Sequence, residues 1–191
     1  MKKSKIVALV VITGLIFACN KKSENNNNIT DSVNQILSSP TLWKDVKSGM
    51  SFDEVKKLYP SSEIVTEEDA PDNFISLQFD GVVVQKENFL VEFLFDDNKL
   101  NTVSLYPKND IRNAIADRLF AGIEEELTLK YGNPVDETSN RISLSYRLRQ
   151  IFWNDQDIII TLNYARSEAS FDLAFIEITY TIGTIEKEDN L

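Results

Sequence analysis

Apolar residues recur at every second position along several stretches of the middle and C-terminal parts of the chain. The clearest set lies within residues 89–95, where Phe89, Val91, Phe93 and Phe95 alternate with other residues. A period of two places one set of side chains on one face of a β-strand. The same pattern predicts strands over 62–66, 74–79, 82–85, 100–106, 141–153, 157–165 and 171–182.

Short polar segments separate these strands and predict how they are connected. Asp80-Gly81 is a strong signal for a two-residue hairpin, so we expect the chain to reverse direction there. Residues 96–98 and 154–156 are rich in aspartate and asparagine and predict two further turns. The strands should therefore form antiparallel meanders.

A helical pattern precedes the first meander. Ser51 and Glu54 form an S-x-x-E capping box ahead of a short apolar stripe that ends at Pro60. Apolar residues within 31–38 and 41–46 predict a helix before this one, so that residues 43–60 join two helices at a corner.

A second helical pattern precedes the second meander. Apolar residues stand at four-residue spacing from Ile111 to Leu127, and Gly132 followed by Pro134 ends the helix. Gly122 lies inside this segment, which leaves open whether it is one bent helix or two. The rhythm of helices and then strands thus occurs twice, and aligning residues 95–98 with 153–156 indicates an imperfect repeat.

The N-terminus predicts export and a lipid anchor. Lysines precede an apolar run from Ile6 to Ala18. This run is too short for a membrane-spanning helix, which needs about 20 apolar residues. The run ends directly before Cys19, and this arrangement resembles the lipobox of bacterial lipoproteins. The resemblance implies a signal peptide over 1–18, a diacylated Cys19 and a polar tether within 19–30. An ordinary signal peptide followed by an incidental cysteine is the alternative.

Charge and composition exclude several classes of function. Removing residues 1–18 takes away three lysines and changes the formal net charge from −10 to −13, which argues against nucleic acid as a partner. The chain has no histidine, and its single cysteine is assigned to lipid. Catalytic triads, histidine metal sites and zinc clusters are therefore not expected, and neither is a cofactor.

The segment GMSFDEVKKLYP, followed by a meander with an F-D-D-N-K turn, is similar to the SmpA/OmlA (BamE-like) lipoproteins of outer-membrane assembly. The second copy, at AGIEEELTLKYGNP and FWNDQDIIITLNY, looks more like the tandem β-lactamase inhibitor protein fold. The resemblance implies an α+β fold of two helix-helix-meander units, 31–107 and 108–185, followed by an acidic tail over 186–191. It further implies one sheet with the helices packed on one face and an open face that binds a partner.

Two features are candidate binding surfaces. Arginines alternate along the predicted strand 141–153, and the tentative partner-binding residues are Arg141, Arg147, Arg149 and Trp153. A basic, partly aromatic stripe suits an acidic peptide or a carboxylate. The acidic segment 67–72 suits a basic partner instead. Ordinary solvated surfaces are the simpler explanation of both features.

These patterns predict a non-catalytic binding module anchored in the cell envelope, on the outer membrane facing the periplasm. Its partner would be another envelope protein, in an assembly or scaffolding role. An inhibitor or immunity-type lipoprotein that blocks a hydrolase is the alternative. A cell-wall hydrolase that uses two carboxylates is a third class, although the obvious aspartates lie in predicted turns.

Overall fold

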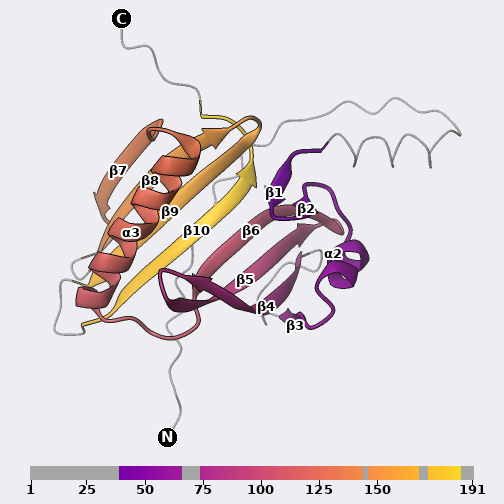
Figure 1. The fold of residues 1–191 in the computed structure, drawn as a ribbon, viewed down its shortest axis with the longest axis horizontal. Coiled ribbons are helices and arrows are strands. Elements are labelled where there is room, and N and C mark those ends of the chain that lie inside the picture. Colours follow the sequence, from indigo (N-terminus) through magenta and orange to yellow (C-terminus); the bar gives the residue numbers. More distant parts are fainter. Residues whose placement is uncertain (1–38, 66–73, 144–145, 168–171, 186–191) are drawn as a thin grey trace, which may run out of the picture.

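Eight antiparallel strands form one sheet in the order β3-β4-β5-β6-β10-β9-β8-β7 (Figure 1). Each strand pairs with its neighbours in regular antiparallel register apart from two bulges. The strands are β3 (Glu63–Val65), β4 (Phe74–Val84), β5 (Glu87–Asp96), β6 (Lys99–Pro107), β7 (Asp136–Arg141), β8 (Tyr146–Asp155), β9 (Ile158–Ser167) and β10 (Ala174–Ile182).

The structure is a computed structural model that describes residues 39–65, 74–143, 146–167 and 172–185. Several expectations fall outside these ranges. They are the signal peptide at 1–18, Cys19 and the tether within 19–30, the helix within 31–38, the acidic segment 67–72 and the acidic tail 186–191.

Two helices and a small hairpin complete the described fold. The helix α2 (Phe52–Leu58) starts at the predicted capping box, in which the Ser51 amide donates to the Glu54 carboxylate at 2.8 Å. The helix α3 (Asn113–Tyr131) is a single helix that passes through Gly122 and ends at Gly132, as predicted. The strands β1 (Thr41–Trp43) and β2 (Val46–Lys47) form a separate two-stranded sheet.

The expected fold of two helix-helix-meander units is wrong. Within the described residues each half has one helix, and strands make up most of the structure. Residues 41–46 form the β1–β2 hairpin instead of a helical turn. Lys44 has a left-handed φ of 49°, which breaks a helix, and the Ser48 amide donates to the Pro40 carbonyl at 3.0 Å to close the hairpin.

The described fold has two halves, and each half is one helix followed by four strands of the sheet. The first half is α2 with β3–β6, and the second is α3 with β7–β10. The last strand of each half lies at the centre of the sheet, where β6 pairs with β10. By element order, the β4–β5 turn of the first half corresponds to the β8–β9 turn of the second.

The predicted hairpin turn at Asp80-Gly81 is wrong, because the chain continues through it as one strand. A bulge lies between Asp80 and Val82, and Gly81 has φ +117°. The turn that follows β4 is Gln85-Lys86, with φ values of 50° and 72°. A glycine that permits positive φ serves a bulge as well as a turn, so this signal does not distinguish the two.

The core lies on one face of the sheet, and both helices pack on that face. Tyr59, at the end of α2, places its ring 5.1 Å from that of Phe93 on β5. Phe120 of α3 stacks on Tyr164 of β9 with ring centroids 4.8 Å apart. Figure 1 shows α3 lying across β8, β9 and β10. The opposite face of the sheet therefore has no helix on it within the described residues.

Candidate functional site

The face of the sheet opposite the helices, here called the open face, carries a row of hydrogen-bonded polar side chains. These residues come from seven neighbouring strands, β4 to β7 in sheet order. We call the row the polar belt, and it consists of Ser76, Gln78, Glu92, Ser104, Tyr106, Thr138, Gln150, Asn163 and Glu177.

In the first half, the belt centres on Glu92 of β5. Its two carboxylate oxygens accept hydrogen bonds from the Ser76 hydroxyl at 2.7 Å and from the Tyr106 hydroxyl at 3.3 Å. The Gln78 amide in turn donates to the Tyr106 hydroxyl at 2.6 Å. Glu92 is therefore held by neighbours on both adjacent strands.

In the second half, the belt centres on Glu177 of β10. Its carboxylate accepts from the Asn163 amide at 3.1 Å and from the Ser104 hydroxyl. The Gln150 amide donates to the Asn163 carbonyl oxygen at 2.8 Å, and Thr138 continues the row to β7. The bond from Ser104 on β6 to Glu177 on β10 joins the two halves.

Burial and charge shift the pKa values at the centre of the belt. Burial raises the pKa of Glu177; the hydrogen bonds from Ser104 and Asn163 oppose this, and the nearby charge of Glu92 adds to it. Burial and the charge of Glu92 raise the pKa of Tyr106 to about 12. The centre of the belt thus holds a buried acid, Glu177, whose ionisation is disfavoured.

Apolar side chains flank the belt on the open face. Leu90 and Leu94 lie on either side of Glu92 along β5, and Phe152 lies on β8. Phe175 of β10 is 38% exposed. Residues 183–185 cross one end of this face, where the Ile185 amide donates to the Asn154 side chain at 3.2 Å.

The charges of the open face are mainly acidic. Within the described strands, lysines occur on this face only at strand ends, where Lys99 lies opposite Asp96 and Lys108 pairs with Asp80. Glu92 and Glu177 stand at its centre. A complementary surface would therefore carry positive charge.

The structure does not bring the predicted arginine stripe together as one exposed surface. Residues 141–153 are not a single strand, because the chain turns after Arg141 and β8 begins at Tyr146. Arg141 and Arg147 therefore lie opposite each other on neighbouring strands, and both are exposed. They lie on the helix-covered face together with Arg149 and Trp153.

The side chains of Arg149 and Trp153 make contacts within the fold. The Arg149 guanidinium makes two bonds of 3.2 Å to Glu124 and one of 2.7 Å to Glu137, and it lies 4.8 Å from the centre of the Phe120 ring. This bond from Arg149 lowers the pKa of Glu137. Trp153 is fully buried in the core. These contacts tie β7 and β8 to α3.

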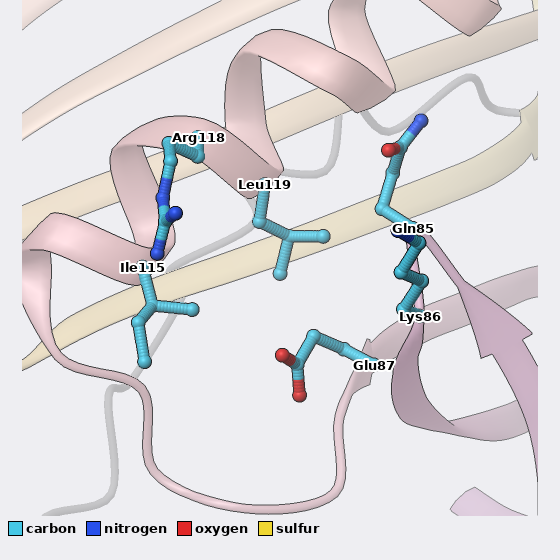
Figure 2. Close-up of a pocket in the computed structure, with 6 residues that line it drawn as sticks. All are labelled: Gln85, Lys86, Glu87, Ile115, Arg118 and Leu119. Atoms are coloured by element: carbon cyan, nitrogen blue, oxygen red, sulfur yellow. The ribbon is translucent and has the colours of Figure 1, made fainter.

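A groove on the helix side is the second candidate site (Figure 2). It has a volume of about 390 Å³ and lies between the β4–β5 turn and α3. Its lining residues are Gln85, Lys86, Glu87, Ile115, Arg118 and Leu119. It is a mixed site, with charged side chains on both walls and aliphatic side chains from the helix.

Sequence reasoning missed Glu92, Tyr106 and Glu177. The signal was present, because the alternation that identifies Phe93 as a core residue also places Glu92 on the opposite face. What the sequence lacks is the strand order, which brings Glu177 beside the β6 residue Ser104. Neither residue is close to the other along the chain.

Across the residues that the structure describes, no group of three or more carboxylates, cysteines or histidines is arranged to hold a metal ion. Neither described helix is long and apolar enough to cross a membrane. Comparisons with protein-family models, with curated proteins and with solved structures find no match, so the family resemblance stays a prediction.

Proposed function

We propose that this chain is a lipid-anchored binding module of the bacterial cell envelope, attached through Cys19, and that it binds a protein partner through the open face. The observation that supports this most directly is the one-sided packing of the sheet. Both described helices lie on one face, while the polar belt and its apolar neighbours lie on the other. Catalysis is not part of the proposal.

The composition of the open face suits a protein interface. Aliphatic and aromatic side chains such as Leu94 and Phe152 supply apolar area beside side chains that form hydrogen bonds. The belt is already hydrogen-bonded within the sheet, so its side chains lose little conformational freedom on binding. The central acids favour a partner that presents lysine or arginine.

The location gives the class of partner. An anchor at Cys19 on the outer membrane, facing the periplasm, restricts the module to proteins of the envelope. The polar segment 19–30 would act as the tether that lets the sheet reach its partner. An assembly or scaffolding role is the function that needs no active site.

Photo-cross-linking in cells that produce the full chain tests the proposal. A photoreactive amino acid at Leu94 or Phe152 should capture an envelope protein, and the same group at Ala121, exposed on α3, should not. Charge reversal by Glu92→Lys should reduce capture, whereas Glu125→Lys on the exposed surface of α3 should leave it unchanged. The variant Cys19→Ser should release the protein from the membrane fraction.

The proposal fails if the open-face positions capture no resident protein or capture the same proteins as Ala121. Capture of an added hydrolase, with loss of its activity at a one-to-one ratio, would support the inhibitor alternative instead. Retention of Cys19→Ser in the membrane fraction would contradict the lipid anchor alone.

A further inference from the structure

The groove between the β4–β5 turn and α3 is held open by contacts at its rim. The Gln85 amide donates to the Glu126 carboxylate at 2.8 Å, which fixes the turn against the helix. Gly122 permits this approach, because a Cβ atom built there would lie only 2.7 Å from the Gln85 side-chain carbon. The two walls therefore have a defined spacing before any ligand binds.

Three charged side chains line this groove without partners. Among the residues that the structure describes, the side chains of Lys86, Glu87 and Arg118 make no hydrogen bond or ion pair. Arg149 and Arg166 differ, since Arg149 pairs with Glu124 and Arg166 with Asp117. The groove thus offers two positive groups and one negative group to a ligand.

The helix wall supplies aliphatic surface. Figure 2 shows Ile115 and Leu119 pointing from α3 towards the space into which Glu87 points from the turn. Ile115 is 39% exposed, whereas Leu119, Ile123 and Leu127 of the same helix are buried. An aliphatic group placed here would remove this surface from water.

We propose that this groove binds the free C-terminus of a peptide whose last residue is aliphatic. The terminal carboxylate lies between Lys86 and Arg118, and the last side chain packs on Ile115 and Leu119. Glu87 accepts a hydrogen bond from a peptide N–H near the terminus. Capture of a chain terminus by charged and backbone groups is an established mode of peptide recognition.

The arrangement of charges favours this ligand over a simple anion. Two cations attract a carboxylate and form charge-assisted hydrogen bonds with it. Glu87 repels a ligand that is anionic throughout but suits one that carries an N–H donor next to its carboxylate. The groove lies on the helix side of the sheet, so this site is independent of the open face and of the function proposed for it.

Titration of the full chain in detergent with N-acetyl-alanyl-leucine, followed by NMR, tests the proposal. The control ligand is the same peptide with a C-terminal amide. We expect the free acid to bind at millimolar concentration with shifts at Ile115 and Leu119, and the amide to bind about tenfold more weakly, because it loses the charge-assisted bonds.

Matched variants locate the site. Arg118→Gln and Lys86→Gln should each weaken binding of the free acid by about fivefold, the effect of one partly exposed charged hydrogen bond. Lys57→Gln, at an exposed position on α2, should not change it. Equal binding of the acid and the amide, no binding of either, or an unchanged affinity in Arg118→Gln and Lys86→Gln would each overturn the proposal. Circular dichroism confirms that each variant is folded.

Discussion

The side chain of Gln85 donates a hydrogen bond to Glu126 at 2.8 Å, and this bond joins the β4–β5 turn of the first half to the helix of the second. It lies beside Gly122 of α3, where an added Cβ atom would meet the Gln85 side chain. The bond therefore connects the two halves of the fold on the helix side of the sheet.

The contact between Gly122 and Gln85 predicts coupled substitutions. Gly122→Ala replaces a helical glycine with a better helix former, and this replacement alone should stabilise the protein by about 1 kcal/mol. The new side chain also displaces Gln85, and the loss of the Gln85–Glu126 hydrogen bond should cost about 0.5–1 kcal/mol. The free energy of unfolding should therefore change by less than about 0.5 kcal/mol. In a Gln85→Ala background the same change should stabilise by about 1 kcal/mol. Equal effects in both backgrounds, measured by urea denaturation, would contradict the contact.

Glu177 predicts a dependence of stability on pH. Burial raises its pKa in the folded protein, so ionisation favours the unfolded chain. The stability contributed by the protonated form is complete below the ordinary pKa of 4.5 and is lost as the pH rises through the folded pKa. Glu177→Gln should thus raise the free energy of unfolding at pH 7, with a gain that shrinks towards pH 4.5. A gain that is independent of pH would argue against the burial of this carboxylate; Glu125→Gln is the exposed control.

The capping box at Ser51 predicts a loss of stability on substitution. Ser51→Ala removes the hydroxyl that accepts from the Glu54 amide at 3.4 Å, and should lower the free energy of unfolding by about 1 kcal/mol. Ser61→Ala, at an exposed position after the helix, is the control. Thermal denaturation of the two variants should separate them, and identical melting temperatures would show that the cap does not stabilise α2.

Substitutions of Trp153 and its accessibility to a quencher distinguish a core residue from a partner-binding residue. Trp153→Ala should destabilise the protein by about 3–5 kcal/mol because it empties a fully buried site. Trp153→Phe should cost less than about 2 kcal/mol, since the buried Nε1 has no hydrogen-bond partner among the described residues. In a Trp43→Phe background, iodide should not quench the remaining fluorescence. Strong quenching would restore Trp153 as a candidate for partner binding.

Two of the three positive-φ positions of β4 and its turn, Gly81 and Lys86, predict opposite effects. Lys86→Gly relieves a left-handed lysine at φ 72° and should stabilise by up to about 0.5 kcal/mol after the entropy of glycine is counted. Gly81→Ala places a side chain at φ +117° in the bulge and should destabilise by about 1 kcal/mol or more. A neutral effect of Gly81→Ala would contradict the positive φ at Gly81, and a destabilising effect of Lys86→Gly would contradict the left-handed backbone at Lys86.

The sequence predicts those elements whose signals are local. The cap at Ser51, the end of α3 at Gly132 and the turn at Asp97-Asn98 are each specified by residues within one turn of the chain, and the structure confirms them. The break between β7 and β8 was missed because apolar residues alternate across it, at Ile142, Leu144, Tyr146 and Leu148. The same alternation assigns Arg147 and Arg149 to the outer face, whereas they lie on the helix side of β8. The rule that assigns the polar residues of a strand to its outer face misplaces a polar residue that lies on the inner face.

The candidate site depends on information that the sequence does not express locally. The belt joins Glu92 to Glu177 only through the order of the strands, and period-two alternation says which face a residue occupies but not which strand lies beside it. The groove depends on the approach of Gln85 to Gly122, residues of different halves. Pairing between distant segments therefore sets both sites.

The central pairing of β6 with β10 has a consequence for folding during synthesis. Thr102 and Thr181, which contact each other across this pair, are 79 positions apart, and each half contributes its last strand to the join. During synthesis on the ribosome, β6 is complete long before β10 emerges. The backbone N–H and C=O groups along this edge of β6 therefore have no partner strand until β10 is made. Such a topology folds slowly and only after the whole domain is synthesised.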